Sequence, residues 1–541
     1  MEGRIVDIPK GGIIYRNGYV YVNISSQYDA SVKYTRSVRK CVGKNVDGKT
    51  MCPNRIYDSL YGYVDAPTRS DVLSVGTHLL IQQVCQQIKL DESLLDAFPE
   101  DTAKQIKDMA SFMLVTESDA FQHYPSYGFS NALFSQEVRS DSSLCRFLRQ
   151  EFPPSRIHRF LDTWSQKHRG SGKAYLCYDS TNINSVAEGV ELAQMGHAKD
   201  DPTKPQVNLE YVVRQEDGLP LLYKDYPGSI TDVTEGSDMI DDIHALGYEN
   251  ITLVCDRGYI SRENITLLDK NNLNFLIMLR MSSKISRELV MRHGKTIRLH
   301  SEYYLPERDA YAMTVSQDFY GSVRYFHIFW NHVDAERGRR NIMNEVERME
   351  MELAQIRTKS GRMNAGQIRA FSQWFALDVE QDSGALCSYQ RDYQKIDNAV
   401  DEEGFFILLS SERLSCTEAA DAYSKRDCVE KTFRSLKSSL GMDTIRAHSD
   451  ETAQSRLFLA FIASIIRSVI FFGLKALRLE DRKNFTVPAV IRELAKVEVL
   501  RDDKTLKYFR RYKLTAKQKK TLAAFSLQES DVDALASSLS P

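Results

Sequence analysis

The pattern of apolar and polar positions changes repeatedly along the chain of 541 residues. Residues 12–50 alternate between the two kinds, which predicts a small β-rich piece with a positively charged edge. Between about residues 72 and 164 the apolar positions recur at helical spacing, as in THLLIQQVCQQIKLDESLL, which predicts a helical region. Short apolar runs then follow, rich in β-branched and aromatic residues.

Those short runs are typical of strands. They comprise residues 174–179, 207–215, 219–227, 251–256 and 274–280. Helical patterns near residues 239–246 and 263–270 flank the fourth run. Three strands, a helix, a strand, a helix and a strand predict a mixed α/β sheet.

The next segment, residues 281–403, breaks this rhythm with alternating strand-like runs such as SVRYFHIFW. It also holds one helix with apolar residues at four-three spacing. These are Ile342, Val346, Met349, Leu353 and Ile356. So short a repeat favours a helical hairpin within the chain over the alternative, a dimer seam.

Residues 457–474, LFLAFIASIIRSVIFFGL, are nearly long enough to cross a bilayer. Arg467 interrupts the run near its middle, and no second candidate exists. Charged residues inside a membrane are costly, so we expect a buried core helix and no membrane contact.

Composition is ordinary for a soluble globular protein, with 42% hydrophobic and 27% charged residues. The net charge of -2 conceals a basic segment, residues 504–520, in which lysines, arginines and three aromatic residues occur without an acid. Such a segment suits a phosphate backbone, although a solvated helical tail is an equal alternative.

The nine cysteines are scattered singly, without the close pairs of a zinc site. An odd, dispersed set is typical of a reducing compartment. The first residues, MEGRIVDIPKGG, do not resemble a secretory signal. We therefore expect a cytoplasmic protein.

Two of the predicted core strands end in an aspartate, Asp179 in AYLCYDST and Asp256 in ITLVCDRGY. The carboxyl ends of strands in α/β sheets are where sites form, although an aspartate there can also simply begin a turn or cap a helix. No G-x-G-x-x-G follows a strand, which argues against a dinucleotide-dependent oxidoreductase.

A third carboxylate lies in the stretch YSKRDCVEKTFRSLK, residues 423–437. On one continuous helix Tyr423, Arg426, Glu430 and Lys437 fall within about 60° of one another and form a polar stripe. A neighbouring apolar stripe gives that helix a face to bury. Asp179, Asp256 and Glu430 together offer the oxygen ligands that Mg²⁺ or Mn²⁺ prefers.

These motifs resemble the signature of cut-and-paste DDE transposases from bacterial insertion sequences. Asp179 in YDSTNI, Asp256 in CDRGY and the Y-x2-R-x3-E-x6-K stripe carry the resemblance. The loop GHAKDDPTKPQVNLEYVV and the run LPLLYKDYPGSITD also resemble that family, except that Ser229 stands where many members have Asn. The similarity is clearest over residues 172–280 and 404–474.

The resemblance implies an α/β fold with an RNase H-like mixed-sheet core, a β-rich insertion, an N-terminal helical DNA-binding region and a helical C-terminal tail. On this basis the expected parts are 1–58, a β-rich piece; 59–170, a helical DNA-binding domain; 171–280 and 404–475, the two parts of the catalytic core; 281–403, the insertion; and 476–541, the basic tail.

For function, the resemblance implies a transposase that binds inverted-repeat ends, cleaves them by two-metal-ion hydrolysis and joins the 3′-hydroxyls to target DNA. Asp179, Asp256 and Glu430 would be catalytic residues and ligands of two Mg²⁺ or Mn²⁺ ions. The expected DNA contacts are made by Tyr423, Arg426, Lys437, His197 and Lys199.

The family also implies a homodimer in a synaptic complex and a bacterial or archaeal, nucleoid-associated location. Two alternatives remain open at this point. One is a catalytically silent, transposase-derived DNA-binding protein, and the other is an RNase H-like nuclease that cuts without strand transfer.

Overall fold

The computed structural model describes most of the chain and divides it into two compact units, Met1–Val72 and Leu73–Pro541. The described residues are 4–29, 34–61, 69–169, 172–196, 201–230, 240, 242–243, 250–358, 361–380, 383–502 and 505–540. Most of the helix expected near residues 239–246 lies outside them.

The first unit is an antiparallel sheet of order β1-β5-β4-β3-β2, followed by one short helix. Its elements are β1 (Val6–Asp7), β2 (Ile13–Ile14), β3 (Tyr19–Asp29), β4 (Tyr34–Asn45), β5 (Thr50–Pro53) and α1 (Arg55–Tyr61). Val20, Val22, Val42 and Met51 form its small buried core. Strands therefore occupy the segment whose alternating pattern predicted them.

The second unit is built on the largest sheet in the described part of the chain, which has ten strands. One half contains β7 (Ala174–Ser185), β8 (Gln206–Arg214), β9 (Pro220–Pro227), β10 (Ile251–Cys255) and β11 (Asn274–Met278). Their order is β9-β8-β7-β10-β11, with β7, β8 and β9 antiparallel. Because β10 runs parallel to both β7 and β11, all three strands point towards the same edge of the sheet.

The other half of this sheet is added by the insertion and by the strand that follows it. It comprises β12 (Tyr304–Leu305), β13 (Ala310–Phe319), β14 (Ser322–Trp330) and β17 (Phe405–Ser410). β17 pairs with both β11 and β14, so the strands of the insertion continue the core sheet. The short strand β18 (Thr444–Ile445) pairs with the end of β7.

The prediction that the insertion is β-rich was wrong, because helices make up more of it than strands do. They are α10 (Lys284–Leu299), α11 (His332–Thr358), α12 (Ala365–Phe371) and α13 (Tyr393–Glu402). The sequence analysis missed α10, whose start is fixed where the Ser283 side chain accepts a hydrogen bond from the Ser286 amide.

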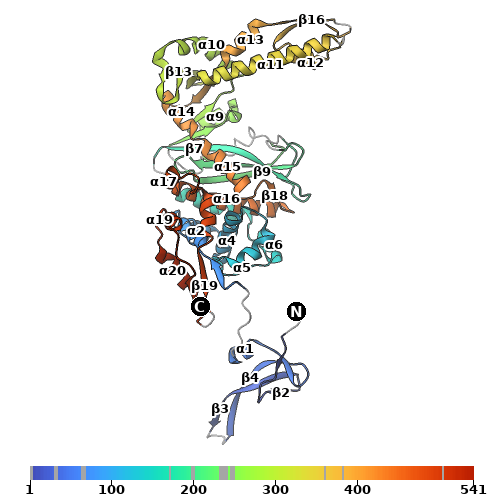
Figure 1. Cartoon of the computed structure of the whole chain (residues 1–541), viewed down its shortest axis with the longest axis vertical. Coiled ribbons are helices and arrows are strands. Elements are labelled where there is room, and N and C mark those ends of the chain that lie inside the picture. Colours follow the sequence, from blue (N-terminus) through green and yellow to red (C-terminus); the bar gives the residue numbers. More distant parts are fainter. Residues whose placement is uncertain are drawn as a thin grey trace. The chain divides into compact units, whose positions relative to one another are not determined.

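The helix predicted from the four-three repeat is α11, which lies beside α13 (Figure 1). Ile342, Val346 and Leu353 are buried in a separate small core that also contains Phe371 and Trp374. The hairpin β15 (Phe375–Val379) and β16 (Leu386–Arg391) completes this subdomain. The apolar stripe of α11 is thus covered within the chain.

A helical layer packs against the core sheet through α16 (Asp450–Gly473). Its N-terminal helices are α2 (Gly76–Gln87), α3 (Leu90–Ala97), α4 (Glu100–Thr116), α5 (Tyr124–Ser130), α6 (Asp141–Gln150) and α7 (Pro154–Lys167). Among the described helices α16 alone is long and apolar enough to cross a membrane, but 61% of its most apolar window is buried. It is a core helix, as predicted from residues 457–474.

The C-terminal region packs against this helical layer. It contains α17 (Lys475–Glu480), α18 (Val487–Leu494), β19 (Glu498–Arg501), β20 (Tyr508–Arg510), α19 (Ala516–Ala523) and α20 (Glu529–Ser538). β19 lies between β20 and β6 (Val72–Ser74), so the end of the chain is tied to the start of the second unit. The predicted helical tail therefore also contains strands.

His327 joins three strands at the seam between the insertion and the core. Its ring nitrogens lie 2.9 Å from the hydroxyl of Thr314 on β13 and 3.0 Å from that of Ser410 on β17. Burial lowers the pKa of His327 to about 4. The folded state therefore favours a neutral ring down to that pH.

We predict that the contribution of His327 to the free energy of unfolding falls as pH is lowered from 6.5 towards 4, because only the unfolded chain then binds a proton at this residue. The contribution is up to about 3 kcal/mol. His168, whose pKa is also lowered to about 4 by burial and by Arg214, acts in the same direction. In urea denaturation across this range His327→Gln should lose less stability on acidification than the unaltered protein, whereas the exposed His158→Gln should follow the unaltered protein. Equal slopes for the two variants would contradict this role.

Candidate active site

Asp179 and Asp256 lie level with each other on neighbouring parallel strands. Cys255, the last residue of β10, pairs with Tyr178 of β7, so Asp179 and Asp256 follow in the same register. Asp179 does not end its strand as predicted, because β7 continues to Ser185 through pairing with β8. Asp256 directly follows the last residue of its strand, and its carboxylate accepts a hydrogen bond of 2.7 Å from the Arg257 amide.

The stretch carrying the third carboxylate is two helices and not the single helix predicted. Tyr423 belongs to α14 (Cys416–Ser424), whereas Glu430 and Lys437 belong to α15 (Asp427–Ser439). Between them the amide of Arg426 donates to the carbonyl of Tyr423 at 3.0 Å, a tighter turn than an α-helix makes. Tyr423 and Arg426 still reach the aspartates, although a tight turn separates the two helices.

The predicted apolar stripe anchors α15 to the sheet. Val429, Phe433, Leu436 and Leu440 are all buried. Phe433 packs against Tyr211 of β8, with ring centroids 5.4 Å apart. Since Tyr211 pairs with Asp179 across β7 and β8, this contact fixes α15 over the strand that carries the first aspartate.

Arg426 brings Asp179 and Glu430 together. One of its guanidinium nitrogens lies 3.1 Å from a carboxylate oxygen of Asp179, and another is hydrogen-bonded to Glu430. The side chains of Arg426 and Asp179 are 13% and 15% exposed, whereas Glu430 is 43% exposed. The pairing therefore takes place at a partly desolvated site, where it is worth more than on an open surface.

Tyr423 reaches the remaining aspartate, with its hydroxyl 3.5 Å from a carboxylate oxygen of Asp256. Burial raises the pKa of Tyr423, so the phenol stays protonated and can donate. Burial acts to lower the pKa of Arg426, but Tyr423, Asp179 and Glu430 outweigh it and raise that pKa. The site thus holds three carboxylates beside a permanently charged guanidinium.

The carboxylates do not form a ready-made cage for a metal ion. Over the described ranges no group of three or more His, Cys, Asp or Glu side chains is placed to hold one. Arg426 occupies oxygens of two of the three acids. Its guanidinium is the positive charge that balances them in this structure.

The remaining predicted contact residues are less well defined. His197 and Lys199 lie outside the described residues. Lys437 is half-buried on α15. The basic segment 504–520 is partly neutralised within the chain, since Arg511 pairs with Glu498 at 2.8 Å and Lys519 with Glu529 at 2.9 Å.

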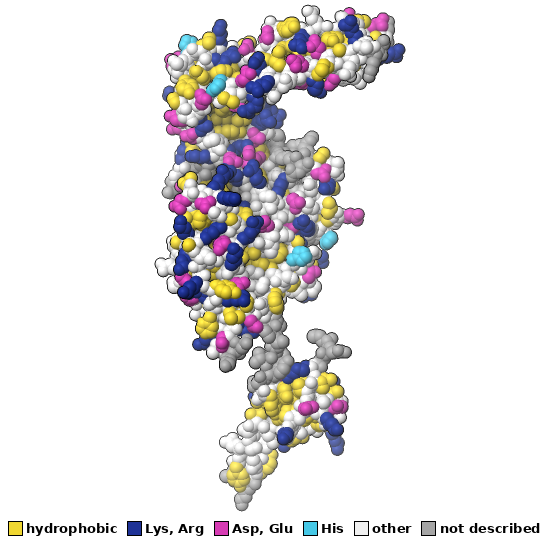
Figure 2. Space-filling model, viewed as in Figure 1, with side chains coloured by type: hydrophobic (Ala, Val, Ile, Leu, Met, Phe, Trp, Pro, Cys, Tyr) yellow, Lys and Arg dark blue, Asp and Glu magenta, His cyan; other side chains and the backbone are white. Residues whose placement is uncertain are grey.

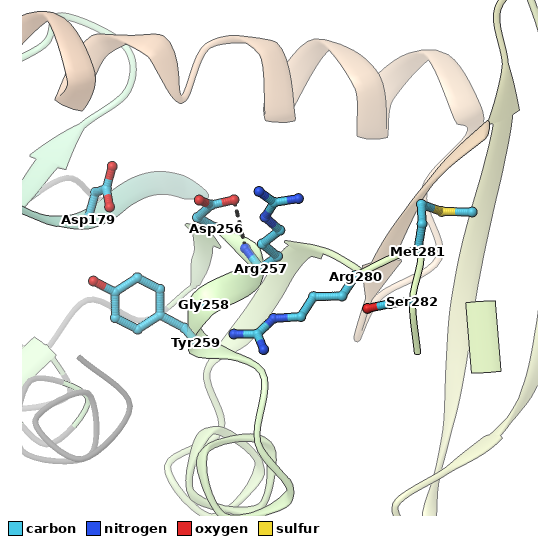
Figure 3. A pocket seen from close by; sticks show the side chains of 8 residues that line it. All are labelled: Asp179, Asp256, Arg257, Gly258, Tyr259, Arg280, Met281 and Ser282. Carbon is cyan, nitrogen blue, oxygen red and sulfur yellow. Dashed lines mark hydrogen bonds between the residues drawn. The ribbon is translucent and has the colours of Figure 1, made fainter. Parts of the chain in front are cut away.

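A cavity of about 610 Å³ opens beside the acids. Figure 3 shows Asp179, Asp256 and Tyr259 along one part of its lining, with Arg257 and Arg280 nearby. Sequence reasoning missed both arginines. Arg280 follows the apolar run of β11 as Asp256 follows that of β10, so attention to basic as well as acidic residues at strand ends could have found it.

The chain matches the transposase DDE domain family over residues 170–466, more than half of its length. This range spans both aspartates, the insertion and the helix bearing Glu430. The chain belongs to the DDE transposase family. No curated protein matches it closely enough to count as a relative.

One similar solved structure is a synaptic complex of the piggyBac transposase with hairpin DNA, determined by cryo-electron microscopy. The match covers 86% of this chain and 82% of that one, with 9% sequence identity and a TM-score of 0.36.

We predict that Arg426→Gln lowers the free energy of unfolding in EDTA by about 1–3 kcal/mol, because it leaves the carboxylate of Asp179 desolvated without a counter-charge. The matched control is Lys431→Gln on the same helix. Lys431 forms a solvent-exposed ion pair with Asp427. That change should cost at most about 0.5 kcal/mol. Equal losses in urea denaturation would show that the bridge to Asp179 adds nothing beyond a surface pair.

Proposed function

We propose that this protein is a transposase of an insertion sequence that binds the inverted-repeat ends of its element, cleaves them by metal-dependent hydrolysis and joins the 3′-hydroxyls to target DNA. Membership of the DDE transposase family supports this function. The single observation that carries it is the convergence of Asp179, Asp256 and Glu430 on Arg426 and Tyr423. These acids are the proposed catalytic residues.

We further propose that the core is RNase H-like. The order β9-β8-β7-β10-β11 supports this assignment, with three antiparallel strands followed by two that run parallel to β7. In this arrangement one acid comes from β7, one directly follows its parallel neighbour β10 and one comes from α15, which packs over β7 and β8. The insertion separates the helix from the strands in sequence.

The proposed cofactors are two Mg²⁺ or Mn²⁺ ions, held by Asp179, Asp256 and Glu430. The donor set fits such ions, since all three residues supply hard oxygen ligands without a thiolate or imidazole. When bound, the ions would activate the attacking oxygen and stabilise the leaving one in an in-line displacement. Arg426 must first release Asp179 and Glu430.

Arg426 then has a second use. A guanidinium turned away from the acids can bind a phosphate of the DNA end through two parallel hydrogen bonds. Tyr423 can hold Asp256 in place or donate to the same backbone, and Lys437 lies further along α15. These residues would position the phosphate without forming a covalent intermediate with DNA.

DNA recognition is proposed to lie mainly in residues 1–165, with the basic segment 504–520 adding contacts to phosphates. Figure 2 shows many Lys and Arg side chains on the visible face of the second unit, in the region where Figure 1 labels α15 and α17. We propose a homodimer, because two ends must be handled together, and a nucleoid-associated location in bacterial or archaeal cytoplasm.

We predict that Asp179→Asn, Asp256→Asn and Glu430→Gln each reduce cleavage in Mg²⁺ by at least about 1,000-fold, since each removes a ligand that supports several kcal/mol of transition-state stabilisation. The measurement is an excision and strand-transfer assay on DNA carrying the flanks of the gene. All three variants should retain DNA binding in a gel-shift assay.

A matched control is Asp427→Asn, which removes a carboxylate from the same helix where it pairs with Lys431 at the surface. It should leave cleavage near the level of the unaltered protein. Binding without cleavage by the unaltered protein would favour a silent DNA-binding protein. Cleavage without joined products would favour a nuclease, and cleavage by all three variants would exclude the acids as the catalytic centre.

A further inference from the structure

A second cavity of about 470 Å³ adjoins the one beside the acids. Arg257 and Arg280 line both cavities, so the two spaces meet at this pair of side chains. The second cavity leads from them past Lys284 to Tyr320 at the tip of the β13–β14 hairpin. A continuous path therefore runs from the catalytic carboxylates to the insertion.

Arg257 and Arg280 are exposed, and in the part of the chain that the structure describes neither guanidinium has an ion-pair partner. Other arginines of the same core are neutralised, as Arg426 is by Asp179 and as Arg214 is by Asp217. Two unpaired cations on one cavity wall repel each other and attract an anion that can lie between them.

The backbone positions these two charges at one edge of the sheet. Arg257 directly follows Asp256, and Arg280 lies two residues beyond the end of β11, which runs parallel to β10. Figure 3 shows the side chain of Arg280 extending towards Gly258 and Tyr259, so it points back to the acids and not out along the insertion. Both arginines thus face the space where a substrate of Asp179 and Asp256 would lie.

The far end of the path is apolar. The rings of Phe319 and Tyr320 lie 4.0 Å apart, and Tyr320 is 40% exposed. Tyr320 and Gly321 have φ of 58° and 87°, which makes the tight turn that holds the aromatic residue at the hairpin tip. Among the described residues that line this cavity the only acid is Glu288, 3.8 Å from Lys284.

We propose that Arg257 and Arg280 form a phosphate clamp that leads one DNA strand from the catalytic acids towards the β13–β14 hairpin. The inference rests on the proposed function and adds two positioning residues to it. The ligand is the sugar-phosphate backbone of one strand of the DNA end, bound at phosphates next to the one that is cut. The guanidinium groups neutralise those phosphates and hold the strand in register with the acids.

The test measures how binding depends on salt, using a duplex that carries the flanks of the gene, in EDTA so that no cleavage occurs. Each lost phosphate contact should reduce the slope of log K against log salt by about 1 and weaken binding about tenfold near 0.1 M salt. We expect this result for Arg257→Gln and Arg280→Gln, and a reduction of about 2 for the double variant.

The control is Arg413→Gln, which removes an exposed charge near the opposite end of β11. At that end Ser411, two residues before Arg413, is hydrogen-bonded to Phe275 of β11. Its slope should equal that of the unaltered protein. Duplexes with single phosphates replaced by neutral methylphosphonates give an independent readout. Neutralising the clamped phosphate should weaken binding by the unaltered protein but should not weaken binding by Arg280→Gln any further.

Slopes and methylphosphonate profiles of the arginine variants that match Arg413→Gln would overturn the clamp. If the unaltered protein nevertheless cuts and joins DNA, the proposed function survives that result. Conversely, reduced slopes in a protein that never cuts DNA would support the clamp as a DNA-binding groove while removing the transposase function. The two failures are therefore distinguishable.

Discussion

The site depends on the neutralisation of three carboxylates that the fold forces together. Asp179, Asp256 and Glu430 are brought together by two parallel strands and a packed helix, and like charges repel more strongly where water is partly excluded. Arg426 relieves this repulsion by bridging two of the acids, and Tyr423 approaches the third. Any cation that replaces Arg426 must supply at least the same positive charge to these carboxylates.

This constraint explains why the acids come from distant parts of the chain. Strands β7 and β10 hold two of them in fixed register, because each is paired on both sides. The helix bearing Glu430 is held by its buried face, with Phe433 against Tyr211. The insertion lies between the aspartates and Glu430 in the sequence and extends the same sheet through β14 and β17. Additional residues in the insertion therefore need not separate Glu430 from the aspartates.

Much of the fold and of the site could be predicted from the sequence, because long apolar runs and strand ends are strong local signals. The five core strands, the buried helix α16 and the buried stripe of α15 all occur where patterns predicted them. The continuation of β7 beyond Asp179 could not be read, because the polar residues there are strand only through pairing with β8. The break at Arg426 and the helices of the insertion were missed because they too depend on contacts with distant parts of the chain. The predicted domain boundaries remain predictions.

We propose that the three acids exchange a guanidinium for divalent cations when DNA is bound. The most direct measurement is an anomalous difference map from crystals of the protein with a DNA end and Mn²⁺. We expect Mn²⁺ peaks in contact with Asp179, Asp256 and Glu430, with Arg426 moved onto a DNA phosphate. Mn²⁺ bound elsewhere, with Arg426 still bridging Asp179 and Glu430, would contradict it.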